Sequence, residues 1–388
     1  MQNFIVFSSN EFDLLNECAY YEEMYRDLGI GIDERLYAIN SPFLMDSQFE
    51  AMKREGRRLR KRRKHDCLTV TSNKEVARIE RIAKEVREAG CRLGFFFLQT
   101  THDNNRIARD AVRELMERRF EMYNHEAIVS NEITIIDDNR EFVVEDEFCM
   151  LNSWYRNNSN RCIRLNISKT VSEAPSVYYV PPNATFHIGC VSDVRNFTAI
   201  NDEKFDLIIM DPPWINRSMI RQKNYVINDS VLYQIEMGGL VPTGLVVVWI
   251  TNREGIEHDL AVHFKRWGIR ILATFYWLKV TKEGEPVCSF SEFYKVPYER
   301  FVLASRPQYA FYYTSAIAND GKVFASVPMA LPSRKPPVIP ILRSLGVQPK
   351  RCLELFARSL HPDTVSVGFE PLLLQSSSCL VANEAKIP

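Results

Sequence analysis

The stretch FDLIIMDPPW, residues Phe205–Trp214, decides the fold that the sequence predicts. Its first six residues are mostly apolar and favour β-structure, and a rigid turn follows them at once. This pattern is typical of a buried parallel strand that ends at a site. In open α/β sheets, ligands bind outside the carboxyl ends of the strands. The stretch therefore predicts an α/β fold with a ligand site at Asp211–Trp214.

The four residues of this turn suit an exocyclic amine on a planar ring. Pro212 and Pro213 fix φ and keep the backbone stiff. The Asp211 carboxylate and the Pro212 carbonyl can accept the N–H groups of such an amine, and Trp214 can stack on the ring face. The alternative is purely structural, a proline-stiffened loop with a buried tryptophan. We interpret Asp211, Pro212, Pro213 and Trp214 as candidate catalytic residues.

The second half of the chain alternates strand and helix patterns in the manner of a doubly wound α/β domain, which we place at residues 176–388. The predicted strands are Phe186–Gly189, Phe205–Ile209, Leu245–Ile250, Ile269–Leu278, Phe301–Ala304, Cys352–Phe356 and Val365–Phe369. The predicted helices are Val231–Met237, Glu257–Trp267 and Pro337–Leu345.

Residues 1–175 mix helical patterns with short strands, which predicts an N-terminal α+β accessory region. Its predicted helices are Glu11–Leu28, Asn73–Ala89 and Asn104–Glu121, and its predicted strands are Ile133–Ile136 and Glu141–Val144.

A basic segment, Lys53–Lys64, holds nine Lys and Arg residues against a single acid, Glu55. Repulsion among these charges disfavours a packed helix and indicates an exposed segment. Three interpretations stay open: a nuclear localisation signal, an arm that contacts phosphates, or a solvated charged face.

Composition narrows the class of protein. The 388 residues carry no net charge, so affinity for nucleic acid must come from local patches. The nine cysteines include no C-x-x-C pair, which indicates a reduced intracellular compartment and no zinc module. His258 and His263 do not have the helical spacing of a ligand pair, so we expect no metal site. With no secretory signal and no apolar run long enough to span a bilayer, we expect a soluble protein.

The DPPW turn resembles the (D/N)PP(W/Y/F) signature of amino-methyltransferases, and its tryptophan makes it similar to the MT-A70 family of adenosine-N6 methyltransferases. Further stretches recur in this order in the methyltransferase-like protein 4 branch of that family. They are residues 248–253 (VWITNR), 277–281 (WLKVT), 297–299 (PYE), 333–337 (SRKPP) and 353–358 (LELFAR). The resemblance covers about Tyr178 to the C-terminus.

The resemblance implies a Rossmann-like domain with a permuted motif order that binds S-adenosyl-L-methionine. It also implies a nucleic-acid substrate, either adenine in DNA or N6 of 2′-O-methyladenosine in small nuclear RNA. A nuclear protein is therefore expected, and an additional cytosolic pool is left open. A contact to a 2′-OH would separate RNA from DNA, and the sequence identifies none. The oligomeric state is likewise left open.

Two candidate cofactor contacts have a physical reason of their own. Glu370 follows the predicted strand Val365–Phe369, where a carboxylate can accept both ribose hydroxyls. Ser333 and Lys335 precede a predicted helix, where free N–H groups and a positive charge suit the carboxylate of the cofactor. The resemblance assigns the same roles to these three residues.

The resemblance adds three more cofactor residues. Arg358 matches an arginine that contacts the cofactor, and Asp193 and Val194 match an element around its adenine. The chain departs from the family at Asp363-Thr364, where the family has Gly-Trp, and at Phe369, where it has Asn.

The expected mechanism is direct in-line transfer of a methyl group. The target adenine leaves its stack and enters a pocket, its amine attacks the methyl group, and Asp211 stabilises the positive nitrogen that forms. One alternative is an inactive scaffold that holds nucleic acid or a partner subunit, which the departures beside Glu370 favour. Another is methylation of a different amine, such as a protein glutamine or cytosine N4.

Overall fold

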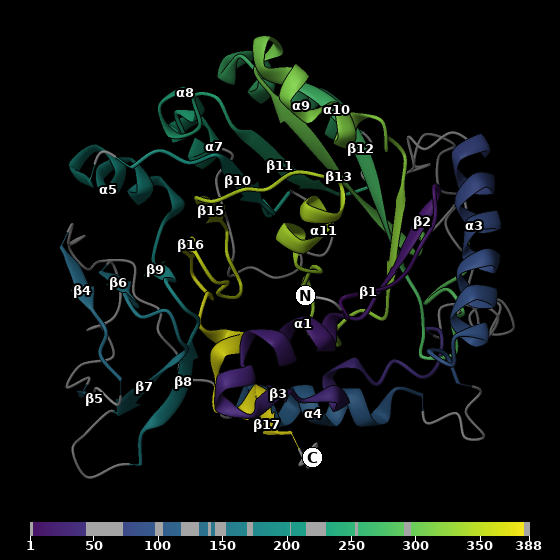
Figure 1. Cartoon of the computed structure of the whole chain (residues 1–388), viewed down its shortest axis with the longest axis horizontal. Coiled ribbons are helices and arrows are strands. Elements are labelled where there is room, and N and C mark those ends of the chain that lie inside the picture. The colour runs from purple at the N-terminus through teal and green to yellow at the C-terminus, as the bar shows by residue number, and fades with distance from the viewer. Residues whose placement is uncertain are drawn as a thin grey trace, which may run out of the picture.

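The buried apolar strands assemble into one large sheet. The computed structural model describes residues 3–43, 73–97, 104–117, 132–138, 141–143, 153–168, 174–201, 203–214, 230–252, 255–290 and 296–383. Within these residues, twelve strands form the sheet that crosses Figure 1. In spatial order they are β1 (Ile5–Ser8), β2 (Phe12–Leu15), β14 (Val323–Ser326), β12 (Arg270–Lys279), β13 (Tyr298–Ser305), β11 (Leu245–Ile250), β10 (Leu207–Met210), β15 (Cys352–Leu355), β16 (Thr364–Gly368), β9 (Thr185–Ile188), β6 (Trp154–Arg156) and β4 (Ile133–Ile135).

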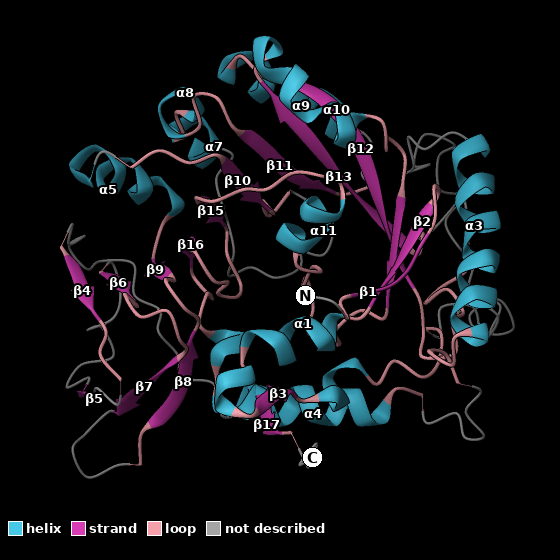
Figure 2. Ribbon diagram, viewed as in Figure 1, coloured by secondary structure: helices cyan, strands magenta, loops and turns pink. Residues whose placement is uncertain are grey.

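Helices and two small sheets surround this sheet, as Figure 2 shows. One small sheet pairs β17 (Leu380–Ala382) with β3 (Ile30–Ile32), and the other joins β5 (Glu141–Val143), β7 (Ile163–Ser168) and β8 (Ser176–Val180). The described α-helices are α1 (Glu17–Met24), α3 (Asn73–Arg92), α4 (Arg106–Glu117), α5 (Val194–Asn201), α7 (Ser230–Gln234), α8 (Met237–Leu240), α9 (Ile256–Trp267), α10 (Thr314–Ile317) and α11 (Val338–Ser344).

The centre of the sheet is parallel. β10 pairs in parallel with β11 on one side and with β15 on the other, and β16 and β9 continue the parallel order. The carboxyl ends of β11, β10, β15, β16 and β9 therefore lie in this order along one edge of the sheet. The α/β class and the strand that ends at Asp211 are confirmed.

Alternation along β10 explains why both faces of the sheet are covered. Leu207 and Ile209 belong to a core cluster that includes α11, whereas Ile208 and Met210 belong to a second cluster that includes α5 and α9. All four side chains are buried. A strand with apolar residues on both faces needs a layer on each side, and these helices provide it.

The connection from β15 to β16 is short. A crossover between parallel neighbours usually takes a dozen or more residues with a helix. Residues 356–363 hold no helix, yet β15 and β16 pair in parallel from Cys352↔Thr364 to Leu355↔Val367. Eight extended residues reach about 26 Å, twice the rise of about 13 Å along a four-residue strand. Phe356 and Asp363 both have φ near +60°, which bends the connection at its two ends.

β13 turns the chain back toward the same edge. It runs antiparallel to β11, so that Trp249 pairs with Phe301 and Ile250 with Arg300. The start of β13 therefore lies where β11 ends. This register brings Glu299 to the edge that carries Asp211.

Residues before 175 supply both ends of the sheet. β2 adds in parallel to β14, and β6 adds antiparallel to β9. The prediction of one helix over Glu11–Leu28 is wrong in its first part, because Phe12–Leu15 is a fully buried strand and α1 begins only after the Asn16 cap. The predicted helix at Asn73 is confirmed as α3, and the domain boundary at 175 stays a prediction.

The interpretations of the basic segment and the expectation of no membrane span depend partly or wholly on residues outside the described ranges. The basic segment Lys53–Lys64 lies outside the described residues. Among the helices that are described, none is long and apolar enough to cross a bilayer.

Candidate active site

The tryptophan of the DPPW turn ties that turn to the neighbouring strand. The Trp214 backbone N–H donates to the Pro212 carbonyl at 2.7 Å, and the indole Nε1–H donates to the Trp249 carbonyl of β11 at 2.7 Å. The indole is 6% exposed and packs in the cluster of Ile208 and Met210. Trp214 is therefore buried, as the structural alternative expected, and it fixes the turn that presents Asp211. Its stacking on a substrate ring stays a prediction.

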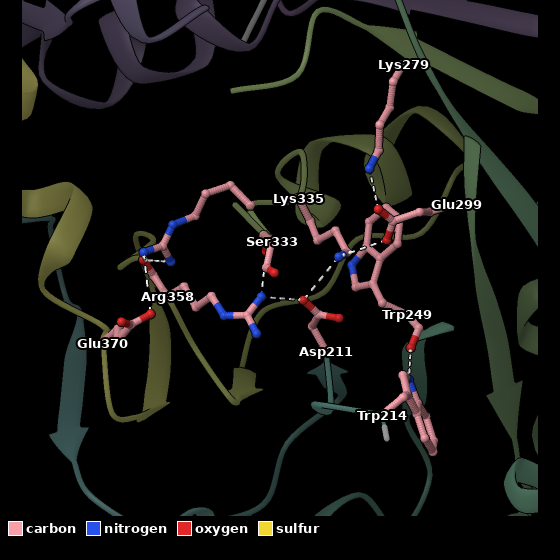
Figure 3. Close-up of polar contacts among 10 residues, drawn as sticks. Asp211, Trp214, Trp249, Lys279, Glu299, Ser333, Lys335, Arg358 and Glu370 are labelled. Atoms are coloured by element: carbon pink, nitrogen blue, oxygen red, sulfur yellow. Dashed lines mark hydrogen bonds and ion pairs between the residues drawn. The ribbon is translucent and has the colours of Figure 1, made fainter. Parts of the chain in front are cut away.

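Side chains of alternating charge meet at Asp211 (Figure 3). Nη1 of Arg358 donates to Oδ2 of Asp211 at 2.9 Å, and Nζ of Lys335 lies 3.3 Å from the same oxygen. Lys335 also lies 2.9 Å from Oε2 of Glu299, whose other oxygen is paired with Lys279. Three cations and two carboxylates thus form one continuous chain of ion pairs.

This chain keeps its buried members charged. Burial opposes ionisation of Glu299, but Lys335 and Lys279 outweigh it, so the pKa of Glu299 lies well below its ordinary value. Burial would also lower the pKa of Lys335, but Asp211 and Glu299 raise it above its ordinary value. At neutral pH, Glu299 is therefore a carboxylate and Lys335 is an ammonium.

One oxygen of Asp211 is open. Both ion pairs use Oδ2, and within the described ranges Oδ1 has no hydrogen-bond or ion-pair partner. The side chain is 20% exposed. The Pro212 carbonyl uses one lone pair for Trp214 and keeps the second. Two acceptors thus remain for an amine at the end of β10.

A second acid, Glu354 of β15, lines the cavity that Asp211 lines. Burial and the nearby Asp211 raise the pKa of Glu354 to about 8. Its Oε2 lies 3.7 Å from Nε2 of His361, and burial lowers the pKa of His361 to about 4. Nδ1 of His361 makes a 2.8 Å hydrogen bond with the hydroxyl of Tyr20 from α1. An N-terminal helix therefore closes one side of the cavity.

The segment 333–335 is locked to the turn after β15. Nη1 of Arg358 donates to the Ser333 carbonyl at 2.5 Å, and Nη1 of Arg334 donates to the Arg358 carbonyl at 2.6 Å. Ser333 has φ +62°, so the backbone reverses there. These contacts hold Lys335 and Arg358 on either side of Asp211.

The predicted site residues fall into two groups. Asp211, Ser333, Lys335 and Arg358 line one cavity. The other six do not line it: Pro212, Pro213 and Trp214 of the turn, and the three cofactor candidates Asp193, Val194 and Glu370. Asp193 follows β9, Val194 begins α5 and is 1% exposed, and Glu370 follows β16 with its carboxylate 3.8 Å from Arg334.

Sequence reasoning gave no role to Lys279, Glu299, Glu354 or His361. The first three lie inside stretches that the family resemblance singled out, which was the only signal for them. Tyr20 lies in none of these stretches, and no pattern in the sequence indicated a role for it. Among the described residues, no group of His, Cys, Asp and Glu could hold a metal ion.

Comparison with known proteins agrees with this geometry. The family model MT-A70 matches residues 205–370. The chain is 35% identical over 377 residues to a DNA N6-methyl methyltransferase of Caenorhabditis elegans, an alignment that covers 96% of this chain and 98% of that protein. It is 36% identical over 208 residues to the N6-methyladenosine RNA methyltransferase MTA1 of Cryphonectria parasitica, covering 51% of this chain and 60% of that one.

A human relative matches a similar part. The chain is 31% identical over 235 residues to the human N(6)-adenine-specific methyltransferase METTL4, covering 57% of this chain and 48% of that protein. The DPPW turn thus lies at a strand end beside paired cations, inside the segment that the family model matches, and one relative aligns over nearly the whole chain. The chain therefore belongs to the MT-A70 family of N6-adenine methyltransferases.

Proposed function

We propose that this enzyme transfers a methyl group from S-adenosyl-L-methionine to N6 of adenine in DNA. The observation that carries the proposal is the Asp211 carboxylate, which two cations hold by Oδ2 while Oδ1 stays open at the end of β10. An amine on an aromatic ring is a poor nucleophile, and a hydrogen-bond acceptor such as Oδ1 of Asp211 would activate it.

The cavity has charges that fit this cofactor, whose methionine end carries a carboxylate, an ammonium and a sulfonium. Lys335 and Arg358 can receive the carboxylate, and Glu354 can face the ammonium. Oε2 of Glu354 is buried and accepts no hydrogen bond within the described residues. An ammonium donor would satisfy that oxygen, so the residues present fit the group.

The arrangement along the sheet also suits an extended ligand. From Asp211 the next carboxyl ends are those of β15, β16 and β9, which lead to Arg358, Glu370 and Asp193. At about 4.8 Å between strands, this row spans about 14 Å. Lys335 and Arg358 would hold the methionine end, Glu370 the ribose, and Asp193 with Val194 the adenine.

When bound, the cofactor supplies an electrophilic methyl group. Asp211 Oδ1 and the Pro212 carbonyl would accept the two hydrogens of the adenine amine and orient its nitrogen. As that nitrogen becomes positive, the fixed carboxylate stabilises it, and Oδ1 can take its proton. Trp214 would hold the turn rigid through Trp249 while this happens.

We propose DNA because the relative that aligns over nearly the whole chain carries a DNA N6-methyl description. The relatives described as acting on RNA or on adenine without further detail align over about half of the chain. A DNA substrate would also place the protein in the nucleus, and the basic segment Lys53–Lys64 is our candidate signal.

The test uses labelled cofactor with matched DNA and RNA oligonucleotides, followed by nucleoside analysis. We expect N6-methyladenine in DNA, and the same product in RNA alone would overturn the choice of substrate.

Asp211→Ala should abolish transfer and bind the cofactor nearly as well as wild type in a titration. A rate within about tenfold of wild type, about 1.4 kcal/mol of barrier, would contradict the role of Asp211. Binding of the cofactor without any transfer by wild type would support the inactive scaffold.

A further inference from the structure

A buried histidine connects the N-terminal region to the loop that carries Asp193. His187 lies in β9, is 0% exposed and pairs with Trp154 of β6 in the antiparallel register. Its Nε2 lies 2.9 Å from Oδ2 of Asp193, and its Nδ1 lies 3.0 Å from the Ser153 carbonyl. Residues 153, 154, 187 and 193 all precede the segment that the family model matches.

We propose that His187 is a positioning residue, which holds the Asp193 carboxylate toward the purine edge of the cofactor and is itself held by Ser153 and Trp154. The inference rests on the proposed function, because it takes S-adenosyl-L-methionine as the ligand. It assigns to the N-terminal strand β6 a part in cofactor recognition.

The polarity of the hydrogen bonds supports this role. The two ring nitrogens of His187 both face oxygen atoms, one of the Ser153 carbonyl and one of the Asp193 carboxylate. A half-turn of the ring would put carbon atoms in the places of both nitrogens and break both hydrogen bonds. Oδ2 of Asp193 is occupied in this way, and within the described residues Oδ1 has no hydrogen-bond or ion-pair partner. That oxygen can accept the exocyclic amine of the cofactor's adenine.

Aromatic packing fixes the plane of the imidazole. The ring of Trp154 stacks on His187 with centroids 4.5 Å apart and planes 16° apart, and it also stacks on Phe197 of α5 at 3.8 Å. Trp154 is 0% exposed and belongs to the same core cluster as Trp214. α5 begins directly after Asp193. Trp154 therefore packs against both His187 and the helix that follows Asp193.

Two substitutions separate the two hydrogen bonds of His187. The amide nitrogen of glutamine reaches the place of Nε2, so His187→Gln keeps a donor for Asp193. The shorter His187→Asn keeps a donor only for the Ser153 carbonyl. His258→Asn, at an exposed position of α9, is the matched control. Circular dichroism and thermal melts would establish that each variant is folded.

The measurement is calorimetric binding of S-adenosylhomocysteine and of its hypoxanthine counterpart, which lacks the exocyclic amine. Wild type should prefer the adenine form by about tenfold or more, the size of a hydrogen bond to a charged group. We expect His187→Asn to lose that preference, and His187→Gln and His258→Asn to keep most of it.

Equal preference in folded His187→Asn and wild type would overturn the inference, and so would an equal loss in both His187 variants. Binding of neither compound by wild type would instead count against the proposed function. Turnover at saturating cofactor should change little in His187→Asn, because Asp211 lies three strands away.

Discussion

Replacing Glu354 with glutamine should make the protein more stable at alkaline pH. Burial, and then the charge of Asp211, raises the pKa of Glu354 from 4.5 to about 8. Between these values the folded state binds more protons than the unfolded state, so the contribution of this group is present below pH 4.5 and is lost as the pH rises toward 8. At about 1.4 kcal/mol for each tenfold change in proton affinity, the whole shift corresponds to about 5 kcal/mol.

Glutamine has the same shape and no charge, so it removes this dependence. Allowing for relaxation around the ionised group, we expect the advantage of Glu354→Gln in unfolding free energy to grow by about 2–5 kcal/mol between pH 5 and pH 9. Urea unfolding of both proteins at several pH values would measure it. His361 titrates in both proteins, so its contribution largely cancels in the difference. Parallel pH profiles for the two proteins would refute a buried, unsatisfied Glu354.

Two further predictions concern contacts outside the charge chain. Trp214→Phe keeps an aromatic ring but removes the donor to the Trp249 carbonyl. This substitution should lower the unfolding free energy by about 1 kcal/mol. It should also lower the transfer rate, while a titration should show unchanged cofactor binding. Lys322→Met should destabilise by about 3–5 kcal/mol, because Asp13 is 1% exposed and 2.8 Å from the ammonium. Denaturant unfolding would measure both this variant and the double variant Asp13→Leu/Lys322→Met, which should regain much of the lost stability. An unchanged unfolding free energy in Lys322→Met would contradict a buried ion pair.

Continuous apolar runs were the part of the fold that could be predicted. β11 has the predicted bounds, Leu245–Ile250, because all six residues are buried in the centre of a sheet, where local pattern and tertiary environment agree. Phe12–Leu15 was predicted as helix because the residues after it are helical in pattern. Its strand state comes from pairing with Val323–Ala325, more than three hundred residues later, and no local spacing encodes that partner.

The site shows the same division. Asp211 could be predicted because a strand and a rigid turn adjoin it in sequence. Glu299 could not, because its importance comes from an antiparallel register that places Trp277 opposite it and brings Lys279 within reach. An isolated glutamate after a proline and a tyrosine is an ordinary surface pattern. The ion pairs that give it a role join it to Lys279 on the preceding strand and to Lys335 before α11.

Contacts across residue 175 join the two predicted regions of the chain. The segment matched by the family model begins at 205, yet the hydroxyl that holds His361 comes from Tyr20, and the carbonyl that holds His187 comes from Ser153. Removing the N-terminal region would also uncover β14 and β9, leaving unpaired strand edges at both sides of the sheet. Residues 176–388 therefore contain the proposed reacting groups but not all of the contacts that position them. In this chain, strand pairing and hydrogen bonds join residues before 175 to the sheet that carries Asp211.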